Sequence, residues 1–181
     1  MRCSTDATRE NVMDIAQWLA GESSWLSPLE LFLRLAIAGA FGALVGFDRE
    51  LANKPAGLRT HTLVSLAAAL FTLITFELYA ELDAKDSDTS ADPIRIIEAV
   101  TSGVAFLAAG AIIRSGGNVQ GLTTGANMWL AGAIGVACGA GFYVLATLGA
   151  IFSVIIITLL RKLESRFIKG DPPPTPPDDR R

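Results

Sequence analysis

Five long apolar stretches, separated by short polar segments, dominate the chain. They cover residues 29–47, 61–80, 94–113, 121–139 and 142–160. An α-helix rises about 1.5 Å per residue and the hydrocarbon core of a bilayer is about 30 Å thick, so a spanning helix needs about 20 mostly apolar residues. The pattern therefore predicts an all-α, polytopic membrane protein that forms a bundle of five transmembrane helices.

The two ends of the chain differ from this central region, residues 29–160. Residues 1–28 carry acidic side chains and a loose apolar stripe, with Trp25 just before the first stretch. This is typical of a segment that lies at the extracytoplasmic membrane–water interface. The segment lacks the basic start and the cleavage site of a secretory signal, so we expect it to stay on the mature protein. Residues 161–181 are basic and then proline-rich, which predicts a disordered cytoplasmic tail.

Basic residues predict the orientation of the bundle, because Lys and Arg near membrane spans are retained in the cytoplasm. A cytoplasmic C-terminus gives the cytoplasmic side the larger share of these residues. They are Arg49, Lys54, Arg59, Arg114, Arg161, Lys162, Arg166 and Lys169, against Arg2, Arg9, Lys85 and Arg95 on the other side. We therefore expect the N-terminus outside and the C-terminus in the cytoplasm.

Composition narrows the classes of function. The chain is 51% hydrophobic with a mean hydropathy of +0.43, as expected for a membrane protein. Its net charge of −3 and scattered basic residues argue against a nucleic-acid partner. Cys3 and Cys138 lie too far apart to suggest a disulfide framework, and we expect Cys138 to be a small buried residue. Because the usual catalytic motifs are missing and His61 is the single histidine, we expect neither an enzyme nor a cofactor.

Small residues spaced four apart predict close packing between the helices. Lipid tails are as apolar as leucine, so helices in a membrane associate through van der Waals contact and interhelical hydrogen bonds. The candidate packing faces are Ala38, Gly42 and Gly46 in the first stretch, Ala131, Gly135 and Gly139 in the fourth, and Ser102, Ala105 and Ala109 in the third.

The first cytoplasmic loop concentrates charged and titratable side chains. They are Asp48, Arg49, Glu50, Lys54, Arg59, Thr60 and His61. One interpretation is that they only anchor two helices at the membrane surface. In the other, Asp48 and Glu50 pair with Arg49 to fix the loop as a functional surface. Thr60 and His61 then hydrogen-bond across the bundle or present a proton-labile group at the interface.

Arg34 and Glu98 are ionisable residues that fall inside the apolar stretches. Arg34 lies near the start of the first stretch and Glu98 about one turn inside the third. A charge at this depth needs a partner or water. An Arg34–Glu98 ion pair satisfies both residues, whereas a cation or proton pathway through Glu98 is the alternative.

A glycine-rich turn separates the third and fourth stretches. It contains Arg114, Gly116, Gly117 and Asn118 and leads into Thr123 and Thr124. Paired glycines permit positive φ and a threonine can cap the following helix, which predicts a tight reversal of the chain. In the alternative interpretation, the backbone N–H groups beside Arg114 hold an anion or a partner's carboxylate.

The chain resembles the MgtC/SapB family of bacterial inner-membrane proteins across residues 29–160. The resemblance rests on G-x-D-R-E at 46–50, K-P-A-G-L-R-T-H-T-L-V-S-L at 54–66 and the D-P pair at 92–93. It also includes S-G-V-A-F-L-A-A-G-A-I-I-R-S-G-G-N-V at 102–119 and G-L-T-T at 121–124. It implies a multi-pass inner-membrane protein connected to magnesium limitation, acid stress and intracellular survival.

The resemblance implies two alternative functions. Some family members look like regulators of other membrane machines, notably the F-type ATP synthase, and an older view made the family magnesium transporters. The family pattern implies that the loop residues and Asn118 are needed for function. It does not identify metal ligands, which stay unknown. A magnesium path needs several oxygen ligands. Glu98 is the clear candidate carboxylate inside a stretch, and a single carboxylate makes a poor magnesium path. We therefore expect a regulator, unless a homo-oligomer brings several copies of Glu98 together.

Two departures from the family pattern stand out. Longer members of the family carry a soluble C-terminal domain. We expect this chain instead to be a short form that ends in the proline-rich tail. Ala108 stands where the family commonly has glycine, which puts the local helix packing in doubt.

Overall fold

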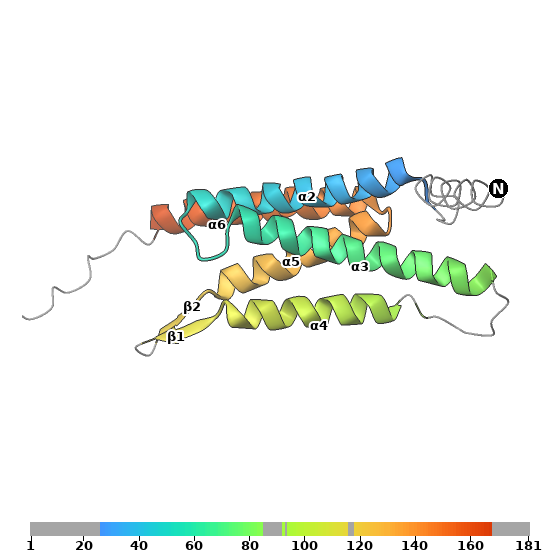
Figure 1. Ribbon diagram of the computed structural model, residues 1–181. Helices are drawn as coiled ribbons and strands as arrows, with labels where there is room; N and C mark the ends of the chain where they lie inside the picture. Colours follow the sequence, from blue (N-terminus) through green and yellow to red (C-terminus); the bar gives the residue numbers. More distant parts are fainter. Residues whose placement is uncertain (1–25, 85–91, 93, 116–117, 168–181) are drawn as a thin grey trace, which may run out of the picture.

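The computed structural model describes residues 26–84, 92, 94–115 and 118–167. This part of the chain forms five helices and one hairpin. The helices are α2 (Pro28–Leu51), α3 (Leu58–Ala84), α4 (Ile94–Gly110), α5 (Leu122–Gly139) and α6 (Tyr143–Phe167), and the strands are β1 (Ile113–Ser115) and β2 (Asn118–Gln120). The helices lie lengthwise beside one another and reverse direction at each connection (Figure 1). Residues 1–25 of the predicted surface segment 1–28, which include Cys3, and the tail beyond residue 167 lie outside the described residues.

The helical membrane fold is confirmed, and the number of spans stays a prediction. Helices α2, α3 and α6 are long and apolar enough to cross a bilayer. Helices α4 and α5 have 17 and 18 residues, which at about 1.5 Å per residue gives lengths of about 26 and 27 Å, close to the thickness of the hydrocarbon core. The prediction of an all-α chain is wrong at the β1–β2 hairpin, which pairs Ile113 with Gln120 and Ser115 with Asn118.

The third predicted span ends earlier than expected. Its apolar run continues to Ile113, but α4 ends at Gly110 and Ile113 already belongs to β1. Two adjacent β-branched residues, Ile112 and Ile113, favour an extended backbone over a helix. Gly121 then closes the hairpin at φ +86°, where a Cβ would overlap the carbonyl oxygen of Ala111. The prediction of a chain reversal is thus confirmed, with strands in place of a simple turn.

Two other boundaries lie beyond the apolar runs. Helix α2 begins after Ser27, whose hydroxyl accepts a hydrogen bond from the Glu30 N–H, and it continues to Leu51. Asp48, Arg49 and Glu50 therefore occupy its last turn and not a loop. Helix α6 continues to Phe167, so the predicted start of the tail at residue 161 falls inside a helix. In both cases polar residues extend the helix past the apolar run.

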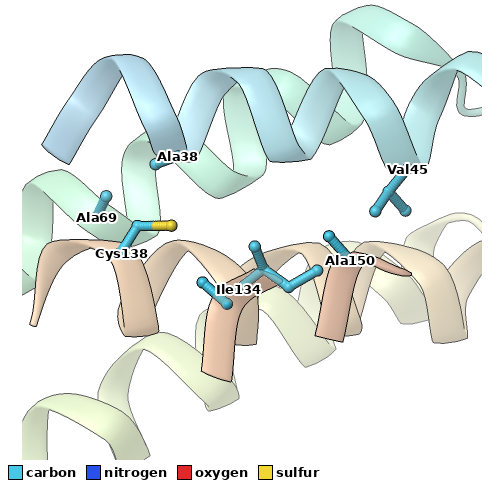
Figure 2. Close-up of a cluster of buried hydrophobic side chains, with 7 residues drawn as sticks. Ala38, Val45, Ala69, Ile134, Cys138 and Ala150 are labelled. Carbon is cyan, nitrogen blue, oxygen red and sulfur yellow. The ribbon is translucent and has the colours of Figure 1, made fainter. Parts of the chain in front are cut away.

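Helix α5 lies at the centre of the bundle and packs against each of the other four described helices. A buried apolar cluster joins it to α2, α3 and α6 (Figure 2). In that view, Cys138 of α5 lies beside Ala69 of α3 and below Ala38 of α2, and Ile134 of α5 lies between Cys138 and Ala150 of α6. Cys138 is fully buried, as predicted. The core consists mainly of small side chains, which allows the helix backbones to approach closely.

Glycines bring the backbones of α2, α3 and α5 into contact. A Cβ on Gly42 would lie 2.6 Å from the carbonyl oxygen of His61, and one on Gly139 would lie 2.7 Å from that of Ala69. At Gly135 an added Cβ would overlap the carbonyl oxygen of Ser65. The hydroxyl of Ser65 also donates a buried hydrogen bond of 2.8 Å to the carbonyl of Ala38. The predicted packing faces of the first and fourth stretches are confirmed.

The predicted packing face of the third stretch is wrong. Ser102, Ala105 and Ala109 are exposed, whereas Val104 and Ala108 are buried. Val104 packs against Gly132 of α5 and the backbone of Ala108 against Gly125. A glycine on the partner helix lets a larger residue fill the contact, which the spacing of small residues on α4 alone does not reveal.

Large apolar side chains cover the outside of the bundle. Phe32, Phe71, Phe106, Phe142 and Phe152 are each more than half exposed, and they come from α2, α3, α4, the α5–α6 connection and α6. Soluble monomers rarely expose apolar patches of such extent. The exposed apolar surface and the long apolar helices show a membrane protein.

Candidate functional site

The candidate site lies at one end of the bundle, where the α2–α3 connection, the β1–β2 hairpin, the start of α5 and the end of α6 come together (Figure 1). We call this the basic end, because Arg49, Lys54, Arg59 and Arg161 are located there. The predicted loop and the predicted glycine turn therefore belong to the same end of the protein.

Glu50 fixes the connection between α2 and α3. Its Oε2 accepts a hydrogen bond of 3.0 Å from the Leu58 N–H, the first residue of α3. A Cβ on Gly57 would overlap the Glu50 carboxylate, so glycine lets that carboxylate reach the helix N-terminus. The predicted pairing of Glu50 with Arg49 is wrong, since the carboxylate caps a helix, where the macrodipole favours negative charge.

His61 is fully buried beneath this connection and not presented at the surface. Its Nδ1 lies 2.7 Å from the Gly57 carbonyl oxygen and donates to it, since a carbonyl can only accept. A Cβ on Gly46 would lie 3.0 Å from that of His61. The expectation that His61 hydrogen-bonds across the bundle or offers a proton at the interface is therefore wrong. The ring fills the space that Gly46 leaves.

Arg49 turns inward from the last turn of α2 and is 5% exposed. Its Nη2 donates a hydrogen bond of 3.2 Å to the Thr124 hydroxyl in the first turn of α5. Thr124 therefore does not cap α5 as predicted. The cap residue is Gly121, which provides no side-chain hydrogen bond. The Nε of Arg49 is buried without a partner.

Asp48 pairs with α6 and not with Arg49. Its Oδ1 lies 2.7 Å from Nη2 of Arg161, a residue 113 positions away in the sequence. The Asp48 side chain is 13% exposed and that of Arg161 is 48% exposed, and the second carboxylate oxygen, Oδ2, is buried without a partner. The ion pair joins the end of α2 to α6, so it fixes one wall of the site.

A cavity of about 640 Å³ lies between these groups. Its charged lining consists of Asp48, Arg49, Lys54 and Arg161, and α5 contributes Thr123, Thr124 and Asn127. Asn127 is not among the site residues predicted from the sequence. It is 6% exposed and its Nδ2 is buried without a partner. A lone asparagine in an apolar stretch is a signal that could have identified it, because a buried amide needs a partner.

The other predicted residues take different positions. Arg59 is exposed at the start of α3 and Thr60 is partly buried. Lys54 is exposed at the mouth of the cavity. Arg114 and Asn118 belong to β1 and β2, but their side chains, and residues 116–117, lie outside the described part of the chain. Their assignment as functional residues stays a prediction.

Arg34 lies at the opposite end of the bundle and is 8% exposed. Its Nη1 donates a 2.8 Å hydrogen bond to the Gly139 carbonyl at the end of α5, and its Nη2 lies 2.6 Å from Oε1 of Glu30. The predicted Arg34–Glu98 pair is therefore wrong. Glu98 is exposed on α4, whereas Glu30 is one turn from Arg34 on the same helix.

The chemistry available at the basic end is the binding of an acceptor group. Arg49 and Asn127, whose Nε and Nδ2 are buried without partners, line one cavity together with two further cationic side chains. In the part of the chain that the structure describes, no group of three or more His, Cys, Asp or Glu residues could hold a metal ion.

Comparison with known proteins places the chain in a family. The MgtC family profile matches residues 35–166. The chain is 42% identical over 129 residues to "Protein MgtC" of Brucella abortus, covering 70% of this chain and 50% of that protein. It is 34% identical over 139 residues to "Putative magnesium transporter YhiD" of Escherichia coli K12, covering 77% and 64%. It is 36% identical over 138 residues to "Protein SapB" of Bacillus subtilis, covering 76% and 59%.

No solved structure matches the chain. The chain spans about half the length of the Brucella relatives. The matched region begins within α2 and ends within α6, so it contains every residue described at the basic end. The protein belongs to the MgtC family.

Proposed function

We propose that the protein acts in bacterial magnesium homeostasis as a regulator of another membrane complex, such as the F-type ATP synthase, under low magnesium or acid stress. The MgtC family membership and a relative named for magnesium transport support the connection to magnesium. In this proposal all five described helices cross the inner membrane. The N-terminus is outside and the basic end faces the cytoplasm, in agreement with the distribution of Lys and Arg.

The observation that carries the regulatory role is the packing at the centre of the bundle. Helices α2, α3 and α5 touch backbone to backbone at Gly42, Gly135 and Gly139. Such contacts leave no room for a hydrated cation where α2, α3 and α5 meet. Mg²⁺ prefers six oxygen ligands and gives up its water reluctantly, so a route through the chain would need a wider polar path. A closely packed bundle is better suited to binding a partner than to passing a hydrated cation.

The described carboxylates near the ends of α2 already have roles within the protein. Glu30 pairs with Arg34, Asp48 pairs with Arg161, and Glu50 caps α3. These contacts hold the ends of the bundle in a fixed geometry. Arg59 is exposed at the basic end, where a fixed positive surface is available to an acidic partner.

The second candidate function is transport of Mg²⁺ or another cation. The exposed position of Glu98 on α4 favours it, because a homo-oligomer could gather several copies of this carboxylate around a shared path. The printed name of the E. coli relative points the same way.

Magnesium flux distinguishes the two functions. We expect liposomes that contain the purified protein and an internal Mg²⁺ indicator to take up no more Mg²⁺ than empty liposomes, because the bundle centre is closed. Circular dichroism of the same liposomes checks that the protein is helical, and an ionophore checks that the vesicles are sealed. Glu98→Gln is the test variant, and Asp92→Asn, an exposed carboxylate outside the helices, is its matched control.

Saturable uptake by the wild-type protein contradicts the regulatory proposal. Loss of that uptake in Glu98→Gln, with uptake retained in Asp92→Asn, then establishes the transporter. Uptake that survives both substitutions also contradicts our proposal and places the path away from Glu98.

A further inference from the structure

We propose that the cavity at the basic end binds the phosphate group of an anionic ligand, with Arg49 and Asn127 as its buried donors. This inference is independent of the role in magnesium homeostasis, since it rests on the lining of the 640 Å³ cavity alone.

The first argument is the state of Arg49. A buried guanidinium needs a counter-charge and partners for its five N–H donors. Arg49 is 5% exposed, its one described hydrogen bond goes to the neutral Thr124 hydroxyl, and its Nε has no partner. In the described part of the chain, the ion pair of Asp48 is formed with Arg161 instead. An anion in the cavity would give Arg49 the charge-assisted hydrogen bonds it lacks.

The second argument comes from α5. Asn127, which is 6% exposed, lines the same cavity, and its Nδ2 is another buried donor without a partner. Gly121, Thr123 and Thr124 also line the cavity at the first turn of α5, which has no side-chain cap. The first N–H groups of a helix have no partner within it, and the macrodipole favours negative charge there. Donor-bearing side chains and the first turn of α5 therefore line the same cavity.

The charge of the lining selects an anion. Three cationic residues and one carboxylate border the cavity, which leaves an excess of two positive charges. Asp48 pairs with Arg161 and also attracts Arg49, so the excess of two positive charges is what remains for the ligand. The unpartnered Oδ2 of Asp48 is an acceptor, and a hydroxyl beside the phosphate would donate to it. A phosphate ester that also carries a hydroxyl therefore fits both the cationic side chains and the Asp48 acceptor.

One part of the cavity lining is apolar. Ile156, Ile157 and Leu160 of α6 form it. A glycerophosphate headgroup would meet the donors while its acyl chain follows the apolar face of α6. Free phosphate fits the donors equally well and leaves the apolar wall unused. The two sources therefore share the phosphate chemistry and differ in how they use α6.

The test measures ligand-dependent stability of the full chain in detergent. A ligand that binds the folded protein raises its unfolding temperature in a saturable way, which gives a dissociation constant. The probes are short-chain phosphatidylglycerol, short-chain phosphatidylcholine and sodium phosphate, with sodium chloride as an ionic-strength control. We expect phosphatidylglycerol to give saturable stabilisation that phosphatidylcholine and chloride do not give.

Three variants locate the effect. Arg49→Gln should weaken binding by about tenfold or more, because it removes a charge-assisted hydrogen bond. Lys54→Gln should weaken it by about threefold or more, and its exposed position spares folding if Arg49→Gln does not fold. Arg59→Gln is the matched control. It removes the same charge from the same end outside the cavity and should leave the dissociation constant unchanged.

Each outcome decides the proposal. Saturable phosphatidylglycerol binding that depends on Lys54 supports a headgroup site, and the same dependence with sodium phosphate supports free phosphate as the source. Two results overturn the proposal. The first is no saturable stabilisation by either probe, and the second is an equal loss of binding in Lys54→Gln and Arg59→Gln, which indicates only general surface charge.

Discussion

Gly135→Ala should lower the free energy of unfolding by about 3 kcal/mol, one of the two largest effects that the structure predicts. The added methyl group would overlap the Ser65 carbonyl oxygen of α3, and it would also lie 2.9 Å from the Cβ of Ala68. Both neighbours are fixed parts of the helix and cannot rotate away, so α3 and α5 must separate. The measurement is unfolding in mixed SDS and detergent micelles, followed by tryptophan fluorescence.

Gly103→Ala is the matched control. Gly103 is exposed on α4, and nothing lies within 4 Å of an added Cβ. Alanine is the better helix former, so this variant should be unchanged or more stable by up to about 1 kcal/mol. Equal stability of the two variants would contradict the close approach of α3 and α5.

Arg34→Met should cost about 2–3 kcal/mol of unfolding free energy. The substitution keeps an apolar stem of similar length and removes the hydrogen bond to Gly139 and the ion pair with Glu30. It also removes a positive charge from the C-terminal end of α5, where the macrodipole favours one. Unfolding in mixed micelles measures the loss, as for Gly135→Ala.

Glu98→Gln provides the comparison for Arg34. Glu98 is exposed and takes no part in the ion pair of Arg34, so its substitution should change stability by less than about 0.5 kcal/mol. If Glu98→Gln destabilises the protein as much as Arg34→Met, the pair predicted from sequence is correct and the Glu30 pair is not.

Sequence reasoning located the helices because their apolar runs are local patterns. It identified the close contacts at Gly42 and Gly135, since small residues at helical spacing are also local. It misplaced the helix ends, because polar residues such as Glu50 can remain helical past the apolar run. The hairpin at Ile113 interrupts an apolar run that looks continuous in hydropathy alone.

The partners at the candidate site could not be predicted in the same way. Arg49 and Thr124 are 75 residues apart, and Asp48 and Arg161 are 113 apart. A single sequence shows that these side chains are charged or polar, but not which helices face one another. From sequence, Asp48 and Glu50 are therefore predicted to pair with Arg49, whereas in the fold Asp48 pairs with Arg161 of α6 and Arg49 donates to Thr124 of α5.

The central claim is that five helices cross the membrane with the basic end in the cytoplasm, and cysteine labelling tests it most directly. Single cysteines replace exposed Asn53, Asp92 or Gln120 in a protein without Cys3 and Cys138. Intact cells with a permeable outer envelope are treated with a membrane-impermeant maleimide before or after lysis. We predict that Asp92→Cys reacts in intact cells, and that Asn53→Cys and Gln120→Cys react only after lysis. Reaction of Gln120→Cys in intact cells would contradict the account, because α4 would then not cross.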